Sequence, residues 1–193
     1  MPRAKAFDPD VVLDRAVELF WQRGYEAASM ALLLQHMGIS RQSLYDTYGD
    51  KHSLFLSAID RYRERVREGL AQTIDEQGTG VAGIRAGFEW VTRDVIGDPV
   101  HRSCLMANAA LELGQRDPEV RDRVATHLRD IEDIFFAAIE RDREGGQLRA
   151  DLDARPLARF LTSSIHGLGI MARGGASEAT VRDSVEMTLS VLS

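Results

Sequence analysis

Apolar residues recur at helical spacing along almost the whole sequence, and this pattern restricts the chain to an all-helical fold. Leu13, Ala16, Val17 and Phe20, for example, follow the i, i+3, i+4, i+7 spacing of one helix face. Alternating β-branched runs bounded by turn residues, which would predict strands, are absent. Glycine-containing breaks separate the periodic segments. The pattern therefore predicts an all-α chain of about nine helices.

The expected helices begin at capping residues and end at glycines. Asp8 caps the first helix, Pro9 occupies its first position, and Gly24 ends it. Ser29 and Ser177 are further predicted caps. The expected helices cover residues 9–24, 30–37, 41–48, 51–74, 81–96, 103–113, 118–143, 156–173 and 178–192. Three short helices thus precede a much longer helical region.

The second and third predicted helices have the lengths and the connection of a helix-turn-helix. Gly38 suits the positive φ of the bend, and Ser40 caps the following helix. Leu44 and Tyr48, four residues apart, share the inner side of that helix. Side chains at its start and on its outer side suit base edges and phosphates. They are Arg41, Gln42, Ser43, Tyr45 and Thr47. On spacing alone, a polar helix between two packed helices is an equally good interpretation.

The charge distribution permits DNA contact at the N-terminal end without requiring it. The net charge is −6, which is unusual for a protein that binds nucleic acid. Residues 1–67 hold ten Lys/Arg and nine Asp/Glu, whereas the rest of the chain holds 14 Lys/Arg and 21 Asp/Glu. Because phosphate contacts depend on local charge, the near-neutral first third is compatible with a DNA-binding surface.

Two runs of residues carry a resemblance to a known family. The run GISRQSLYDTYGDK at residues 38–51, and the run FWQRGYEAAS at residues 20–29, closely resemble the signature of the tetracycline-repressor (TetR) family. The match covers about residues 8–59, with Gly24, Gly38, Tyr45 and Lys51 in register together. The resemblance implies a DNA-binding domain at residues 1–50 and a helical ligand-binding and dimerisation domain at residues 51–193.

The resemblance also implies roles in DNA contact. The predicted DNA-binding residues are Ser29, Ser40, Arg41, Gln42, Ser43, Tyr45, Thr47 and Lys51. The family pattern places Arg41–Ser43 in the major groove and assigns Ser29, Tyr45 and Lys51 to the DNA backbone. Lys51 also begins the fourth helix, where free N–H groups favour phosphate.

This chain departs from the family pattern at several positions. Asp46 and Thr47 stand where an aromatic residue and a histidine are common, and Tyr48 replaces phenylalanine. Leu34 and Met37 stand where alanine is common. Asp46 would repel a phosphate or accept a hydrogen bond from a cytosine amino group. These departures affect which operator is read rather than how DNA is bound.

The last two predicted helices are the expected dimer interface. The family uses these helices to pair two subunits, and a palindromic site requires paired heads. Gly167 and Gly169 would allow close helix approach. The predicted dimerisation residues are Leu157, Phe160, Leu161, Ser164, Ile165, Leu168, Val181, Val185, Leu189 and Leu192. The alternative is that these apolar stripes face only the core of their own subunit.

The middle helices are the expected pocket for a small-molecule effector. Aromatic and methionine side chains with one amide and one imidazole suit a mostly apolar ligand, although each residue taken singly is also a normal core residue. The candidates are Phe88, Trp90, Val91, Cys104, Met106, Asn108, Leu111, His127, Ile131 and Phe135.

Cys104 has a separate interpretation as a reactive thiol. It lies near an expected helix start and close to His101 and Arg102, which would lower its pKa. The segment also resembles a TetR subgroup with Gly-Cys-Leu at this place, some members of which sense electrophiles or oxidants, but here Ser103 replaces the glycine. The alternative is a small buried apolar residue.

Other classes of site are not predicted. Neither His-x-x-x-His nor Cys-x-x-Cys occurs, so no metal site or cofactor is expected. Phosphate-loop and Gly-x-Ser-x-Gly motifs are also missing, so no enzyme is predicted. No apolar run approaches the roughly 20 residues of a membrane span. With one cysteine and no apolar stretch after the first residues, a cytoplasmic location is expected.

The sequence therefore predicts a homodimeric transcriptional regulator that responds to a ligand. By analogy with the family it is a repressor of transcription, and activation of transcription is the alternative. It would bind a pseudo-palindromic operator in double-stranded DNA and leave it when an effector binds. Two alternatives come from other classes of protein. One is a helical small-molecule binder that no longer contacts DNA, and the other is a helical enzyme with His127 or His166 as acid or base.

Overall fold

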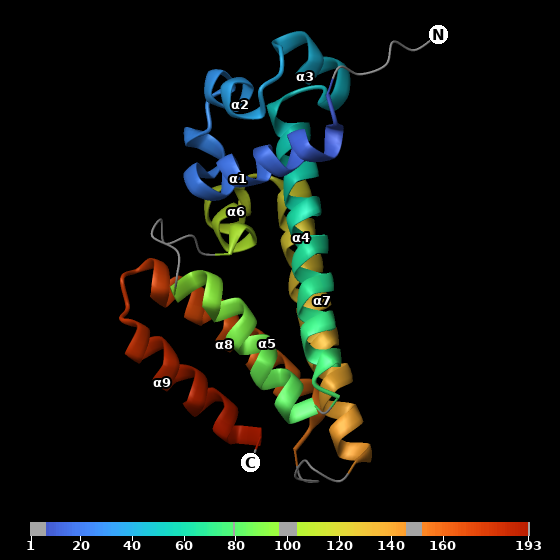
Figure 1. Cartoon of the computed structure of the whole chain (residues 1–193), viewed down its shortest axis with the longest axis vertical. Coiled ribbons are helices and arrows are strands. Elements are labelled where there is room, and N and C mark those ends of the chain that lie inside the picture. Colours follow the sequence, from blue (N-terminus) through green and yellow to red (C-terminus); the bar gives the residue numbers. More distant parts are fainter. Residues whose placement is uncertain (1–6, 79, 97–103, 146–151, 193) are drawn as a thin grey trace. The chain divides into compact units, whose positions relative to one another are not determined.

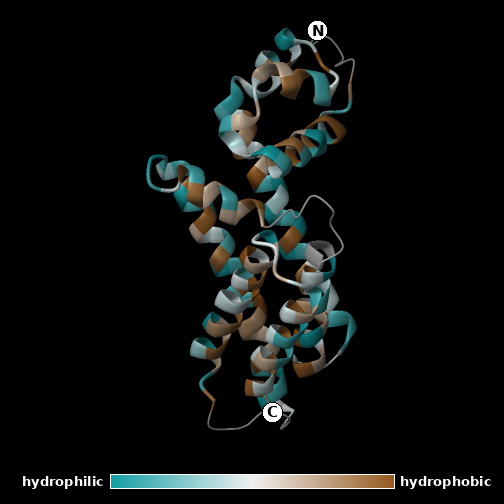
Figure 2. Cartoon of the chain, turned by 90° about the vertical axis from the view of Figure 1, so that its left-hand side faces the viewer, coloured by the Kyte–Doolittle hydropathy of each residue, from teal (hydrophilic) through white to brown (hydrophobic). Residues whose placement is uncertain are grey.

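The computed structural model describes residues 7–78, 80–96, 104–145 and 152–192, and its regular structure there is entirely helical (Figure 1). The helices are α1 (Pro9–Ala27), α2 (Met30–Met37), α3 (Arg41–Tyr48), α4 (Lys51–Glu76), α5 (Gly80–Ile96), α6 (Leu105–Leu113), α7 (Pro118–Glu144), α8 (Ala154–Arg173) and α9 (Glu178–Leu189), followed by a 3₁₀ turn, η1 (Ser190–Leu192). Brown and teal stretches alternate along the helices in Figure 2, as expected for helices with one apolar side. The predicted all-α fold is confirmed.

The contacts within the chain divide it into two compact units. The first unit comprises Met1–Glu64 together with Leu105–Val124, and the second comprises Arg65–Cys104 together with Ala125–Ser193. The first unit therefore combines the three N-terminal helices with the start of α4, all of α6 and the start of α7. The division into two units describes how the residues pack. The predicted boundary at residue 50 concerns which residues bind DNA, and it stays a prediction.

Aromatic side chains form the centre of the first unit. The Phe20 ring of α1 packs edge-on against Phe55 of α4, with centroids 4.9 Å apart, and Tyr25 packs on the same Phe55 ring at 4.9 Å. The guanidinium of Arg61 adds a two-pronged ion pair, since its Nε and Nη2 donate to the Asp14 carboxylate at 3.0 and 3.2 Å. These contacts fix α1 across the first half of α4.

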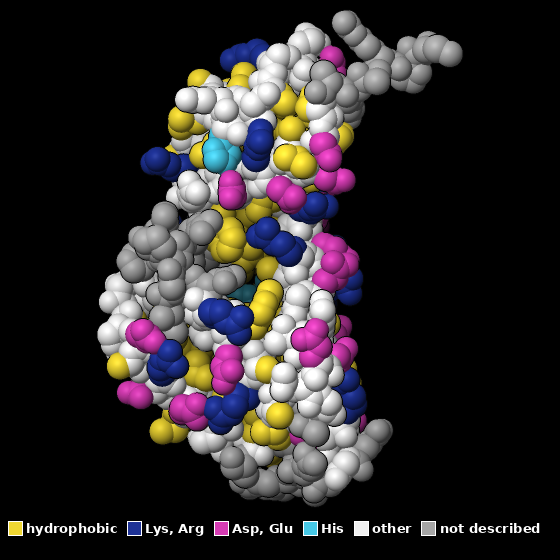
Figure 3. All heavy atoms as spheres, viewed as in Figure 1, with side chains coloured by type: hydrophobic (Ala, Val, Ile, Leu, Met, Phe, Trp, Pro, Cys, Tyr) yellow, Lys and Arg dark blue, Asp and Glu magenta, His cyan; other side chains and the backbone are white. Residues whose placement is uncertain are grey.

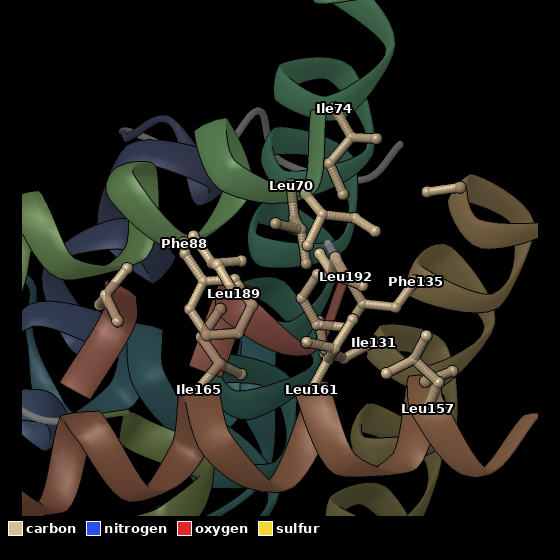
Figure 4. Packing of buried hydrophobic residues seen from close by; sticks show 14 of the residues in the cluster. Leu70, Ile74, Phe88, Ile131, Phe135, Leu157, Leu161, Ile165, Leu189 and Leu192 are labelled. Carbon is tan, nitrogen blue, oxygen red and sulfur yellow. The ribbon is translucent and has the colours of Figure 1, made fainter. Parts of the chain in front are cut away.

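A larger apolar cluster fills the second unit. Figure 4 shows side chains from α4, α5, α7, α8 and the C-terminal segment pointing toward one another. Phe88 and Phe135 are both fully buried, and their ring centroids lie 5.7 Å apart. The labelled members of the cluster are Leu70, Ile74, Phe88, Ile131, Phe135, Leu157, Leu161, Ile165, Leu189 and Leu192.

The end of α1 differs from the prediction. Gly24 does break the helix, with φ 75° and ψ 177°, but a further helical turn follows as far as Ala27. The Glu112 carboxylate of α6 accepts the N–H groups of Tyr25 and Glu26 at 2.8 and 3.1 Å. This acceptor satisfies the donors of the new turn, so the helix resumes beyond the glycine.

The start of α8 was predicted two residues too late. Asp153 caps the helix by accepting the Arg155 N–H at 3.2 Å, so the helix begins at Ala154 rather than at Pro156. Pro156 falls in the first turn, where a backbone N–H has no partner within the helix and its loss costs little.

The start of α5 depends on a buried carboxylate far away in the sequence. Asp142 of α7 is only 3% exposed, and its two oxygens accept the N–H groups of Gly80 and Val81 at 2.5 and 2.6 Å. A Cβ at Gly80 would lie 2.3 Å from the Ala138 carbonyl oxygen, so only glycine fits there. The prediction started this helix at Val81, one residue later than observed.

Candidate functional site

The helix-turn-helix has the local structure that its residues predict. Ser29 caps α2 by accepting the Leu32 N–H at 3.3 Å, and Ser40 caps α3 by accepting the Ser43 N–H at 3.1 Å. Gly38 lies between the two helices in the left-handed region, with φ 71° and ψ 30°. Its N–H donates to the Leu34 carbonyl, which closes the C-terminus of α2.

The inner side of this motif is firmly supported by the rest of the first unit. Leu33, Met37 and Leu44 are fully buried. The Tyr48 hydroxyl donates to the Pro9 carbonyl at 3.0 Å, and Arg15 donates to the Met37 carbonyl at 3.1 Å. Both helices are therefore held from behind by apolar packing and by hydrogen bonds to α1.

The outer side of α3 is polar and open to solvent. Arg41, Gln42 and Tyr45 are exposed, and Ser43 and Thr47 are half-buried. On the face of the first unit seen in Figure 3, basic and acidic side chains are interspersed, consistent with the near-neutral charge of residues 1–67. This outer side has the donors that base edges and phosphates require.

Two of these polar side chains are already hydrogen-bonded within α3 and its cap. Gln42 Nε2 donates to Asp46 Oδ1 at 2.7 Å. The hydroxyls of Ser40 and Ser43 lie 2.9 Å apart. Asp46 therefore orients the Gln42 amide, and a base read by Gln42 must match that orientation or displace Asp46.

Lys51 is held close to the end of α1. Its ammonium lies 4.4 Å from the centroid of the Tyr25 ring, a cation–π arrangement. Burial lowers the pKa of Lys51, against the opposing effect of the Glu26 and Glu112 carboxylates. Of the free N–H groups expected at the start of α4, that of Ser53 is taken, because it donates to the Asp50 carboxylate at 2.7 Å.

The residues predicted for the effector pocket are distributed over both units. In the second unit, Phe88, Ile131 and Phe135 belong to the buried cluster, with Trp90 and Val91 packed against it. In the first unit, Met106 and Asn108 are buried, whereas Leu111 is 82% exposed. The second unit therefore places five of the ten predicted residues around one core, and Cys104 and His127 occur elsewhere in the same unit.

Cys104 lies beside two histidines that sequence spacing did not bring together. Its Sγ is 3.9 Å from Nε2 of His127 on α7, and the His127 and His166 rings meet edge-on with centroids 5.5 Å apart. Burial raises the pKa of the Cys104 thiol, but the hydrogen bonds and charges of His127 and His166 outweigh it and hold that pKa well below its ordinary value. His101 and Arg102, the predicted cause, lie outside the described residues.

The pKa of His166 shifts in the opposite direction. Burial lowers it, but the Cys104 sulfur and the Thr162 carbonyl raise it above the ordinary histidine value. Cys104 and His166 therefore favour a thiolate beside an imidazolium. The two histidines that lower the pKa of Cys104, His127 and His166, lie 23 and 62 residues farther along the chain. A local sequence pattern therefore cannot predict either contact.

The structure places most of the predicted dimerisation residues in the core of their own subunit. Phe160 is 44% exposed and Ser164 is half-buried. The buried residues are Leu157, Leu161, Ile165, Leu168, Val181, Val185, Leu189 and Leu192. Other apolar side chains of α8 and α9 are exposed: Ile170, Met171 and Met187.

Among the described residues no helix has both the length and the apolar character to cross a membrane.

Comparison with known proteins agrees with this geometry over the whole chain. Residues 12–58 match the family model for bacterial regulatory proteins of the tetR family, and residues 80–187 match the model for a tetracyclin repressor-like C-terminal domain. The HTH-type transcriptional regulator YezE of Bacillus subtilis is 37% identical over the full length of both chains. The HTH-type transcriptional repressor ComR of Escherichia coli is 30% identical over 91% of this chain and 84% of its own.

A solved structure extends the similarity to three dimensions. The TetR family transcriptional regulator CifR, a cysteine mutant in complex with 26-base-pair double-strand operator DNA, superposes with a TM-score of 0.87. It is 30% identical and the match covers 99% of this chain and 100% of CifR. With both family models and a full-length relative in agreement, this chain belongs to the TetR family of DNA-binding transcription regulators.

Proposed function

We propose that the protein is a homodimeric repressor that binds a pseudo-palindromic operator through α3 and is released by a small-molecule effector. The observation that carries this proposal is the exposed polar side of α3 on a firmly supported helix-turn-helix. The similarity to a regulator bound to operator DNA, and to relatives named as repressors, supports it. In this proposal residues 1–50 form the DNA-binding domain and residues 51–193 bind the effector and the second subunit, with Lys51 adding a DNA contact at the boundary. The protein acts in the bacterial cytoplasm without a catalytic role.

The contacts with DNA follow from the placement of each side chain. Arg41 and Gln42, exposed at the start of α3, read base edges. Tyr45 and Lys51 bind the DNA backbone, together with the cap residues Ser29 and Ser40 and the half-buried Thr47. Ser43 faces the major groove beside Arg41 and Gln42. Each dimer places two such helices in successive major grooves, with half-site centres about 34–36 Å apart or a multiple of that distance.

Removing a base-reading side chain should change the DNA sequence that the protein selects. We expect Arg41→Ala and Gln42→Ala each to cost about 1–3 kcal/mol at the preferred site and to relax one position of the motif recovered from random DNA. Arg121→Ala, which removes an exposed positive charge from α7, is the matched control and should leave the motif unchanged. A uniform loss of affinity with the same motif would reassign both residues to backbone contacts.

Salt dependence separates this function from that of a helical small-molecule binder that has lost DNA contact. Contacts with phosphates release counterions, so operator affinity should fall steeply as salt concentration rises. A protein that retained no affinity for any duplex at low ionic strength would fit the alternative instead.

The proposed dimer interface consists of the exposed apolar side chains of α8 and α9. Phe160, Ile170 and Met171 of α8 and Met187 of α9 are all exposed, and large exposed apolar side chains grouped on two helices are typical of an interface. The buried residues of the predicted stripes then support this surface from below. Ser164 and Gly167, both half-buried on α8, permit close approach of a second helix.

A charge placed on this surface should prevent pairing. Met187 is 72% exposed, so Met187→Glu should fold normally but sediment as a monomer at concentrations where the wild-type protein is a dimer, because the interface would bury an unpaired carboxylate. Leu111→Glu, at an 82% exposed position in the first unit, is the control and should remain dimeric. A Met187→Glu protein that stayed dimeric would exclude this surface.

The effector is expected to bind in the second unit, around the buried aromatic residues Phe88 and Phe135 with Trp90 and Val91 at their edge. An effector releases the operator only if it binds better to the form of the dimer that does not fit DNA. Leu111 lies on the surface, so among the predicted pocket residues it is the least suited to contact a buried effector.

A further inference from the structure

Three side chains from three different parts of the second unit converge at one point, where His127 is buried and Cys104 and His166 are partly buried. Cys104 directly precedes α6, His127 lies on α7 and is 1% exposed, and His166 lies on α8. One ligand atom from each residue, a sulfur and two ring nitrogens, all lie within 4.8 Å of one another. The site therefore offers three potential ligand atoms to a metal ion, whereas a cysteine by itself offers one.

The distances between these donor atoms are close to those around a bound metal ion. Zinc–sulfur bonds of about 2.3 Å and zinc–nitrogen bonds of about 2.0–2.1 Å place tetrahedral donors roughly 3.3–3.6 Å apart. Here the Cys104 sulfur is 3.9 Å from Nε2 of His127. The three donor atoms lie within 4.8 Å of one another, so the side chains would have to rotate to bring them to these distances.

The surroundings of His166 fix the nitrogen that is available to a ligand. Its Nδ1 is 2.8 Å from the Thr162 carbonyl oxygen, so Nδ1 carries the proton and donates it to that oxygen. Nε2 is then the nitrogen left to bind an ion, and metal binding would displace any proton that it carries. Metal-binding histidines characteristically donate their other ring N–H to a carbonyl or carboxylate, which sets the tautomer and orients the ring.

One member of the cluster, His166, borders a groove that opens to solvent. His166 and Thr162 line a surface groove of about 240 Å³ between α7 and α8. An ion can therefore reach the His166 ring from outside, although His127 is buried.

We propose that Cys104, His127 and His166 bind a thiophilic transition-metal ion, Zn²⁺ or Cu(I), with one coordination position left open. One thiolate and two imidazoles are ligands that these two ions prefer, whereas Mg²⁺ and Ca²⁺ prefer oxygen. Spacing along the chain predicts no metal site, because 23 positions separate Cys104 from His127 and 39 separate His127 from His166. The fold, rather than a motif, assembles the site.

Direct binding to the full-length protein tests this proposal without DNA, so its result is independent of the proposed repressor function. Metal-free protein is titrated separately with Zn²⁺, with Cu(I) under reducing conditions, and with Mg²⁺. We expect one Zn²⁺ or Cu(I) per chain and no Mg²⁺. Co²⁺ as a spectroscopic substitute for Zn²⁺ should produce a thiolate-to-metal absorption band, which reports the Cys104 sulfur directly.

Variants identify the ligands. Cys104→Ser and His166→Gln should weaken binding by more than the roughly 10–100-fold that the loss of an outer hydrogen-bond partner costs, and Cys104→Ser should abolish the Co²⁺ band. His36→Gln is the control, since His36 pairs with Glu18 in the first unit and should not affect binding. Circular dichroism checks that each variant folds.

Protection of the thiol provides a second measurement on the wild-type protein, which does not depend on any variant. One equivalent of the bound ion should slow the alkylation of Cys104 by iodoacetamide, because a coordinated sulfur is a poorer nucleophile. The proposal is wrong if neither Zn²⁺ nor Cu(I) binds, if binding survives unchanged in both variants, or if alkylation proceeds at the same rate with and without the ion. Fast alkylation without metal binding would instead identify a reactive thiol.

Discussion

Phe135→Ala should lower the free energy of unfolding by about 3–5 kcal/mol, because it leaves a cavity at the centre of the second unit. Phe135 is fully buried, and its ring packs 5.7 Å from that of Phe88, centroid to centroid. The loss combines the transfer of a buried aromatic side chain to water with the contacts that its neighbours no longer make. Urea unfolding followed by circular dichroism, at one fixed protein concentration, measures the change.

Two further variants distinguish the cavity from other causes of a lower free energy of unfolding. Phe135→Leu retains much of the side-chain volume and should cost clearly less than Phe135→Ala. Leu111→Ala removes apolar atoms at an 82% exposed position and should change stability by no more than about 0.5 kcal/mol. If Phe135→Ala were as mild as Leu111→Ala, the packing of the second unit around this ring would be incorrect.

Asp142→Ala should destabilise the protein by about 2–4 kcal/mol, although it removes only a small polar side chain. The Asp142 oxygens accept two N–H groups at the start of α5, those of Gly80 and Val81, at 2.5 and 2.6 Å. The Gly80 bond is buried, so water cannot replace the lost acceptor without rearrangement. Each unsatisfied buried donor costs about 1–3 kcal/mol.

Amide hydrogen exchange locates the effect of this substitution. Exchange at Gly80 and Val81 should accelerate in Asp142→Ala, since those two amides lose their partners and the first turn of α5 frays. Asp142→Asn retains one acceptor oxygen and should show roughly half the loss. Equal stability of Asp142→Ala and the wild-type protein would contradict the role of Asp142 as the cap of α5.

The helix-turn-helix could be predicted from the sequence because the interactions that begin and end its two helices are local. Ser29 and Ser40 bond to N–H groups three residues ahead, and Gly38 bonds to a carbonyl four residues behind. Such contacts leave a signature within a few residues, which is why the bounds of α2 and α3 are confirmed to the residue.

Three features that the sequence did not reveal depend on partners that are far away along the chain. Glu112 extends α1 from 87 residues beyond Tyr25, and Asp142 caps α5 from 62 residues beyond Gly80. Cys104 meets His127 only because α7 passes beside it. No local pattern distinguishes these acidic and histidine residues from ordinary surface residues of a helix.

The predicted dimerisation residues could not be assigned to an interface from the sequence for a different reason, since helical periodicity is the same for a dimer interface and for an internal core. Leu161 and Ile165 have the helical spacing of an interface, but the same spacing describes a helix that packs on its own core, where both are buried. Phe160, next to Leu161, points outward and is 44% exposed. Periodicity finds the apolar side of a helix but cannot say which molecule covers it.

The composition of the first unit has a consequence for engineering. The stretch from Leu105 to Val124, which includes Glu112, belongs with the N-terminal helices, although residues 65–104 separate it from Glu64. A chimera that transplants the recognition helix onto another regulator by exchanging only the first fifty residues would separate Tyr25 from Glu112 and Phe20 from Phe55. Such grafts need both stretches from the same parent, or a matching carboxylate in the host.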